Sequence, residues 1–169
     1  MARNVEIKAR IDSVEALASR VAELADSGPC ELLQDDTFFA CAGGRLKLRI
    51  FSDSEGQLIF YRRPDTAGPK ESFYIISPTT SPRTMLDVLS LAYGQTGRIK
   101  KHRTLFLVGR TRIHLDCVAE LGHFIELEVV LGEDEPAEVG VAIARDLLAQ
   151  LGISPSQLIE GAYVDLAHA

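Results

Sequence analysis

The sequence predicts an α+β fold in which antiparallel strands predominate and a few helices pack against them. Short segments alternate apolar and polar residues with the period of two that half-buried strands show, and turns such as Gly43-Gly44 separate them at hairpin spacing. Three longer segments repeat apolar residues at helical spacing instead. The chain has 169 residues, the size of one ordinary domain, so we expect a single domain over 1–169.

Eight segments are predicted as strands. The first, Asn4 to Ile11, alternates strictly and places Val5, Ile7 and Ala9 on one face with Ile11. A ninth strand, which would be the fourth after the second helix, is expected in the region 98–107, where a bulge would bend the chain. The other predicted strands are residues 34–40, 45–51, 57–63, 71–77, 99–106, 110–118 and 124–131.

Capping residues mark the predicted helices. Ser13 is a typical N-cap for a helix over 14–25, which Gly28-Pro29 is expected to end. Ser81-Pro82 opens a second helix that runs to about Tyr93. The longest helix is predicted from Pro136 to Leu151, with Val139, Ile143, Leu147 and Leu151 on its buried side, and a short helix follows at 156–158.

Composition excludes several classes of protein. The net charge of −6, from 24 acids and 18 bases, argues against binding to a nucleic-acid polymer or a membrane surface. No apolar run approaches the roughly 20 residues that a membrane span needs, and no signal-peptide pattern is visible. Three widely spaced cysteines fit neither a disulfide framework nor a zinc site, so we expect a cytoplasmic protein.

Full charges of both signs occupy the strand faces opposite the apolar ones. The third strand carries Arg45, Lys47 and Arg49, and the last carries Glu126 and Glu128. One interpretation is an antiparallel sheet with a solvated face. The other is a barrel with an ionic interior that holds a polyanion and a divalent metal. In that case Glu6, Glu126 and Glu128 would bind Mg²⁺ or Mn²⁺, and the bases would bind phosphate oxygens for metal-assisted displacement at phosphorus.

Several ordered motifs carry a resemblance to a known family. They are Asn4-Val5-Glu6-Ile7-Lys8, Gln34 to Phe39, Leu46 to Arg49, Tyr61 to Asp65, Lys70 with Ser72, Lys101 to Arg103, Ile113 to Asp116, Leu121 to Glu128 and Tyr163 to Leu166. With them the chain resembles the CYTH superfamily, the triphosphate tunnel metalloenzymes, which includes class IV adenylyl cyclases and thiamine triphosphatases. The resemblance implies an eight-stranded antiparallel β-barrel, a triphosphate tunnel, with helices packed outside.

The resemblance also implies roles for single residues. It makes Glu6, Glu126 and Glu128 metal ligands, with Asn4 as a further oxygen donor. It implies a catalytic role for Asp116, which would assist the metal or the nucleophile, and for Lys8. The triphosphate contacts would be Lys8, Lys47, Arg49, Arg62, Lys70, Lys101 and Arg103. Because Arg62 and Arg63 alternate, only one of them points inwards, and Arg62 is preferred.

The reaction and the substrate stay open at this point. ATP, thiamine triphosphate and inorganic tripolyphosphate are all candidate substrates, and both cyclisation of ATP and hydrolysis fit the same residues. Asn4 stands where the family has its first signature glutamate, so a non-catalytic module that binds triphosphate or polyphosphate is the alternative. A structural barrel with internal ion pairs is a third candidate. His114 points inwards by alternation, with a structural role as an equal alternative, and a homodimer through the helices near the chain ends is left open.

Overall fold

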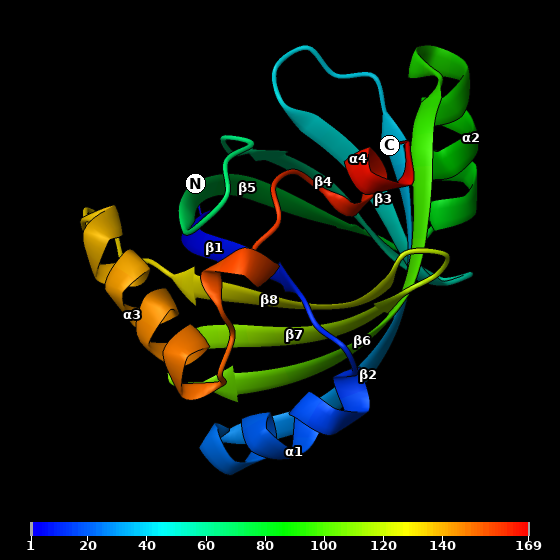
Figure 1. Ribbon diagram of the computed structural model, residues 1–169. Coiled ribbons are helices and arrows are strands. Elements are labelled where there is room, and N and C mark those ends of the chain that lie inside the picture. Colours follow the sequence, from blue (N-terminus) through cyan, green and yellow to red (C-terminus); the bar gives the residue numbers. More distant parts are fainter. Residues whose placement is uncertain (1, 169) are drawn as a thin grey trace.

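The structure is a computed structural model that describes residues 2–168, and the eight strands of this part close into one antiparallel barrel (Figure 1). Around the barrel the order is β1-β5-β4-β3-β2-β6-β7-β8, so β1 lies between β5 and β8. The strands are β1 (Ala2–Arg10), β2 (Ser27–Phe39), β3 (Arg45–Ser52), β4 (Glu55–Arg62), β5 (Lys70–Thr79), β6 (Gln95–Val108), β7 (Thr111–Val118) and β8 (Gly122–Val130). The predicted barrel is confirmed.

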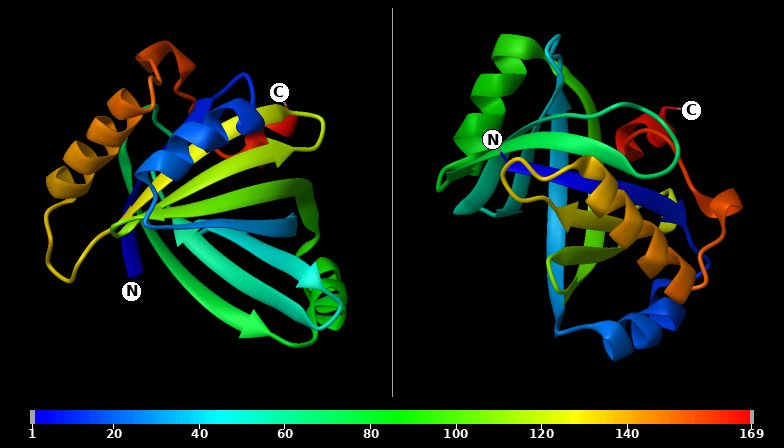
Figure 2. Two further views of the ribbon diagram at one scale, coloured as in Figure 1. Left: turned by 90° about the horizontal axis from the view of Figure 1, so that it is seen from below. Right: turned by 90° about the vertical axis from the view of Figure 1, so that its left-hand side faces the viewer.

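The helices are α1 (Val14–Leu24), α2 (Pro82–Tyr93), α3 (Ala137–Gln150) and the short α4 (Tyr163–Ala167), with one 3-10 turn, η1 (Pro155–Gln157). Figure 2 shows α2 on the opposite side of the barrel from α1 and α3. The helix α1 packs on β6, β7 and β8, α3 packs on β1 and β8, and α2 packs on β2, β3 and β4. Among residues 2–168, no helix is long and apolar enough to cross a membrane.

The main hydrophobic core lies between the barrel wall and these helices. Val5 and Ile7 of β1 point outwards and pack in one cluster with Leu17 and Val21 of α1 and Leu147 of α3. Because strand residues alternate between the two faces, this outward apolar face directs the polar residues of β1 into the barrel. The solvated-sheet interpretation is therefore wrong, since Asn4, Glu6 and Lys8 are all buried.

The buried side of α3 agrees only in part with the predicted one: Leu147 and Leu151 are buried as expected, but Val139 is not. Gly140 and Ala144 face the barrel, whereas Val139 is 39% exposed. A Cβ atom on Gly140 would lie 2.7 Å from a methyl carbon of Val5. The two small residues thus allow α3 to approach β1 closely, and this close approach rotates the helix away from its most apolar stripe.

Two strands are longer than predicted. The strand β2 begins at Ser27, so Gly28 and Pro29 lie in an irregularity of this strand, where the register with β6 shifts, instead of in a helix-ending turn. Its pairing partner β6 is a single strand of 14 residues, and only three strands follow α2 within residues 2–168. Pairing along the full length of both strands overrides the local turn preference of Gly-Pro, because a bulge accommodates the extra residues.

The residues after η1 cross one end of the barrel. Leu158 forms an isolated bridge with Ala9, and the amide of Ile159 donates to the carbonyl oxygen of Lys8 at 3.0 Å. Tyr163 and Val164 of α4, which the sequence did not predict as a helix, pack against Phe124 in an apolar cluster. The C-terminal segment (residues 158–167) therefore covers this end of the barrel, as Figure 1 shows.

Candidate functional site inside the barrel

The barrel interior contains a cavity of about 420 Å³, the tunnel, whose wall includes residues from all eight strands. This volume is within the range of small-molecule sites. Its charged lining consists of seven bases (Lys8, Lys47, Arg49, Arg63, Lys101, Arg103 and Arg112) and four carboxylates (Glu6, Asp36, Glu126 and Glu128). A protein with a net charge of −6 thus surrounds its cavity with an excess of positive charge.

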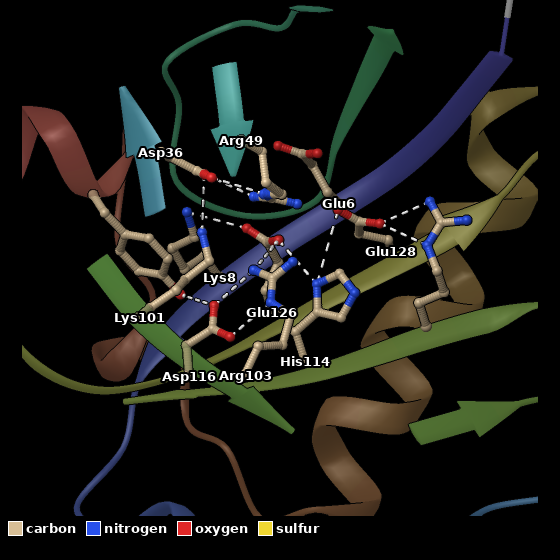
Figure 3. Close-up of polar contacts among 12 residues, drawn as sticks. Glu6, Lys8, Asp36, Arg49, Lys101, Arg103, His114, Asp116, Glu126 and Glu128 are labelled. Carbon is tan, nitrogen blue, oxygen red and sulfur yellow. Dashed lines mark hydrogen bonds and ion pairs between the residues drawn. The ribbon is translucent and has the colours of Figure 1, made fainter. Parts of the chain in front are cut away.

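A cluster of two glutamates and a histidine lies on β7 and β8 (Figure 3). The strand register pairs His114 with Glu126 and Arg112 with Glu128, so all four side chains share the inner face. The Nδ1 atom of His114 lies 3.2 Å from Glu126 Oε1 and 4.0 Å from Glu128 Oε1. Lys8 contacts the other oxygen of Glu126 at 3.1 Å, and Arg112 contacts the other oxygen of Glu128 at 2.7 Å.

These contacts keep both glutamates ionised. Burial alone would raise the pKa of Glu126, but Lys8, His114 and Arg103 outweigh it and hold that pKa well below its ordinary value. Burial likewise raises the pKa of Glu128, and His114 and Arg112 lower it below the ordinary value. Two charged carboxylates beside an imidazole nitrogen form a donor set that divalent cations bind.

A second carboxylate, Asp36 of β2, organises three bases on the opposite wall. It accepts two hydrogen bonds of 2.8 Å from Arg49, one of 3.0 Å from Lys47 and one of 3.3 Å from Lys101. Burial raises the pKa of Asp36, but the three cations hold it well below its usual value. Burial and the neighbouring Arg49 lower the pKa of Lys47 to about 8, although Asp36 opposes this change.

The predicted catalytic residue Asp116 lies behind the wall instead of on it. It is fully buried, and both of its oxygens accept hydrogen bonds of 2.7 Å from Arg103. The hydroxyl of Tyr163 donates a third, also at 2.7 Å. Burial raises the pKa of Asp116, but the opposing effect of Arg103 is larger, so the pKa lies well below its ordinary value. A carboxylate with these contacts orients Arg103.

The first strand brings Glu6 and Lys8 to the tunnel, as predicted, together with Asn4. Glu6 forms an ion pair with Arg63, whose other nitrogen donates to the carbonyl oxygen of Gly161 at 2.9 Å. Lys8 lies 3.9 Å from the ring centre of Tyr163, on its face. In this geometry Glu6 is directed to Arg63 and does not join the cluster of His114, although it is the strand partner of Glu128.

Two predicted contacts, Arg62 and Lys70, are not among the residues that line the tunnel. Arg62 is exposed and lines a cleft that shares Phe38, Tyr61 and Arg63 with the tunnel. Arg63 lines the tunnel itself and Arg62 does not, so the preference for Arg62 as the inward residue is wrong. Arg63 continues the tunnel-lining series Gln57, Ile59 and Tyr61, so strand alternation along β4 would have favoured Arg63. Lys70 is buried, and its Nζ donates to the carbonyl oxygen of Thr66 at 2.7 Å. Burial and the neighbouring charges of Arg63 and Lys8 together lower the pKa of Lys70 to about 8.

Other site residues were missing from the sequence-based set. Asp36 stood in a quoted motif without a role, Arg112 and His114 alternated inwards with Asp116, and Tyr163 belonged to the closing motif. Alternation could have found Arg112, because it shares the inner face of β7 with His114. No local sequence pattern predicts a tunnel position for Tyr163, because the C-terminal segment that carries it reaches the tunnel only by crossing the barrel end.

Both ends of the tunnel carry apolar side chains, with Phe38, Ile99 and Tyr163 at the end covered by the C-terminal segment. At the end covered by the C-terminal segment, Tyr163 lies beside Lys8 and Lys101. The opposite end, toward the start of β2 and the end of β3, carries apolar side chains, and we call it the Phe51 end. Its lining includes Leu32, Phe51, Ile76 and Leu105.

The donor atoms of the tunnel suit a divalent cation. Three ligand atoms, one each from His114, Glu126 and Glu128, lie within 4.8 Å of one another. The amide oxygen of Asn4, on the wall of the same cavity, is buried without a hydrogen-bond partner. A buried oxygen with an unused lone pair is costly unless something binds it, so these residues fit the metal that the sequence predicted.

The protein is a closed antiparallel barrel with a charged interior and helices packed on its outside. The family model of the CYTH domain matches residues 2–163, and the chain belongs to this family. A relative in Aeromonas hydrophila, named adenylate cyclase CyaB, is 25% identical over 94% of this chain and 85% of its own length.

Solved structures share the fold. The PH1012 protein from Pyrococcus horikoshii has a TM-score of 0.85 at 20% identity, over 96% of this chain and 98% of that one. A candidate adenylyl cyclase from Hippeastrum, reported with a dominant triphosphatase activity, has a TM-score of 0.63 at 16% identity, over 99% of this chain and 94% of that one. At these identities the likeness is one of fold.

Proposed function

We propose that the tunnel binds an organic triphosphate with a divalent metal ion and catalyses a displacement at phosphorus. The observation that carries this proposal is the wall of seven bases and four carboxylates inside an acidic protein. A triphosphate is a compact polyanion, and arginine and lysine side chains bind its oxygens. Membership of the CYTH family and the name of the Aeromonas relative support the proposal.

The chain's own residues would bind and orient the phosphates. Lys8, Lys47, Arg49, Arg63, Lys101 and Arg103 line the tunnel, and the carboxylates of Asp36 and Asp116 preset the positions of four of these bases. Such preset positions lower the reorganisation that charge development at phosphorus would otherwise require. Asp116 would act as a positioning residue through Arg103, whereas Lys8 lies where it can touch substrate.

The metal would be held by Glu126 and Glu128, with Asn4 and Glu6 on the adjacent strand. When bound, it supplies charge neutralisation at the phosphate oxygens. Arg63 would have to release Glu6 before that carboxylate could take part.

The Phe51 end favours an organic substrate. Its apolar side chains suit a base or a similar ring and offer nothing to inorganic tripolyphosphate. Cyclisation of ATP would need the ribose 3′-hydroxyl to attack the α-phosphorus, whereas hydrolysis needs an ordered water at the terminal phosphorus. The second candidate is binding without turnover, because Asn4 adds no charge and Glu6 is paired with Arg63.

Phosphorus NMR tests the proposal. The protein is incubated with ATP, thiamine triphosphate or tripolyphosphate, each with Mn²⁺ or Mg²⁺, and Glu126→Gln is the control variant. Pyrophosphate with cyclic AMP identifies a cyclase, and orthophosphate that disappears in the variant identifies a hydrolase. In the Mg²⁺ samples, phosphorus lines that broaden on addition of the protein while the substrate stays intact identify the binding module. Intact substrates without broadening would contradict both candidates.

A further inference from the structure

The histidine in the glutamate cluster adds a nitrogen atom to an oxygen donor set. His114 is 5% exposed, and its Nδ1 atom faces the Oε1 atoms of Glu126 and Glu128, at 3.2 and 4.0 Å. The three side chains come from facing positions on β7 and β8, which fix their backbones by hydrogen bonds. The ring therefore lies beside both carboxylates with Nδ1 directed towards them, as Figure 3 shows.

Two of the bases around this cluster bind the outer oxygens of its carboxylates. Lys8 binds Oε2 of Glu126, and Arg112 binds Oε2 of Glu128, while both Oε1 atoms are on the side of His114. Charged groups that hold the outer oxygen of a carboxylate orient it, as partners of metal ligands do. The nearest exception is Arg103, which lies 3.5 Å from Oε1 of Glu126.

The spacing of the three donor atoms is close to that of ligands on one ion. Two donors bound at about 2.0–2.2 Å to the same ion lie roughly 3.0–3.5 Å apart. The separation between His114 and Glu126 is within this range, and Glu128 is 4.0 Å from the ring nitrogen. A rotation of the Glu128 side chain covers the difference.

The hydrogen bonding of the ring permits a ligand role. Within residues 2–168, the Nε2 atom of His114 has no hydrogen-bond partner, so the neutral ring can carry its proton there and present the Nδ1 lone pair to an ion. The Nδ1 lone pair of His123, by contrast, is already used, because it accepts a hydrogen bond from the amide of Val14. Asn4 supplies an independent sign of a ligand, since its buried oxygen on the same cavity wall has no partner.

We propose that His114 is a nitrogen ligand of the divalent ion, so that the tunnel selects Mn²⁺ or another first-row transition ion over Mg²⁺. The inference rests on the proposed function in so far as the tunnel works with a divalent ion. Mg²⁺ prefers oxygen donors and keeps several waters, whereas imidazole suits the transition ions. A histidine ligand in this cluster therefore shifts the preference of the site from Mg²⁺ to a transition ion such as Mn²⁺.

Metal binding is measured on the full chain without any triphosphate. Isothermal titration gives the affinities for Mn²⁺ and Mg²⁺, and electron spin-echo envelope modulation of bound Mn²⁺ detects a directly bonded nitrogen. We expect the wild type to bind Mn²⁺ at least about tenfold more tightly than Mg²⁺. We also expect a ¹⁴N modulation that changes to the ¹⁵N pattern in uniformly labelled protein.

The variant His114→Gln separates a ligand from a structural side chain. Glutamine keeps an N–H donor for Glu126 but has no ring nitrogen. We expect the ¹⁴N modulation to disappear and the Mn²⁺ affinity to fall by about tenfold or more, with less than about a threefold change for Mg²⁺. The control His102→Gln alters an exposed histidine on the outer face, paired with Glu31, and leaves both values unchanged.

The outcomes distinguish this inference from the proposed function. Equal affinities for the two ions, no Mn²⁺ binding, or a nitrogen signal that persists in His114→Gln would overturn the inference. Circular dichroism checks that His114→Gln folds. If it does not, the wild-type spectrum still shows whether a nitrogen atom is bonded to Mn²⁺. Triphosphate binding or turnover with Mg²⁺ alone would leave the proposed function intact while the inference fails.

Discussion

Arg103 and Asp116 form a closed pair inside the protein, with two parallel hydrogen bonds of 2.7 Å between the guanidinium and the carboxylate. The carboxylate is completely buried, and the guanidinium reaches the tunnel wall. Burial lowers the pKa of Arg103, but Asp116 outweighs it and raises that pKa well above the ordinary value. One side of this pair is thus structural and the other faces the substrate space.

Replacement of Asp116 by asparagine should therefore act first on stability. The change leaves the buried charge of Arg103 without its partner, which costs about 3–5 kcal/mol in comparable buried pairs. We expect urea unfolding to show a loss of this size. The double variant Arg103→Met/Asp116→Leu removes both charges and should regain part of it. A fully stable Asp116→Asn protein that has lost only turnover would favour a direct catalytic role.

Affinity for tripolyphosphate should fall as the pH rises from 7 to 9. Burial and Arg49 lower the pKa of Lys47 to about 8, so its charge is present below pH 8 and is lost above it. The variant Lys47→Arg keeps its charge throughout and should show a smaller fall in isothermal titrations. Lys100→Arg, on the exposed outer face, is the matched control. An identical pH profile in all three proteins would contradict the assignment of Lys47.

The two neighbouring arginines at the end of β4 should differ in their effect on binding. Arg63 lines the tunnel and Arg62 does not, so Arg63→Met should weaken tripolyphosphate binding by about tenfold or more, as expected for a hydrogen bond to a charged group. Arg62→Met should stay within about twofold of the wild type. Melting curves check that Arg63→Met keeps the C-terminal segment in place, because Arg63 also binds Gly161. Similar losses in both variants would count against the tunnel as the binding site.

The Phe51 end should distinguish organic from inorganic triphosphates. Loss of an aromatic platform under a base costs roughly tenfold in affinity or more, so Phe51→Ala should weaken binding of ATP and leave tripolyphosphate unchanged. Phe73→Ala is the matched control, because Phe73 lies on the outer face of β5 beneath Arg3. Equal losses for both ligands would show that the ring does not lie at this end.

The strands and their inner faces were accessible from the sequence because alternation survives in every strand. It predicted the inward Glu6, Lys8, Lys47, Arg49, Glu126 and Glu128, which all line the tunnel. Strand ends were less accessible. Arg63 continues the inward alternation of β4 although it lies just past the last paired residue of that strand, and Gly28-Pro29 suggested a turn where long-range pairing with β6 produced a strand.

The features that the sequence did not predict depend on contacts between segments that are distant in the sequence. The rotation of α3 depends on the fit of Gly140 against Val5, which no helical pattern contains. The role of Asp36 depends on Lys101, which lies 65 residues away in sequence. Tyr163 reaches Asp116 only because the C-terminal segment turns across the barrel end. A sequence pattern gives the face of a strand, but tertiary packing decides which charges meet.

The position of β1 between β5 and β8 also bears on how the chain reaches its native state. Residues at the start of the chain must pair with residues 122–130 before the ring of strands is complete, and such non-local pairing makes folding slow. Until β1 inserts, β5 and β8 each present an unpaired edge, which another chain can extend into an aggregate. Insertion of β1 therefore removes the two edges at which neighbouring molecules could pair during folding, and refolding yield should depend on protein concentration.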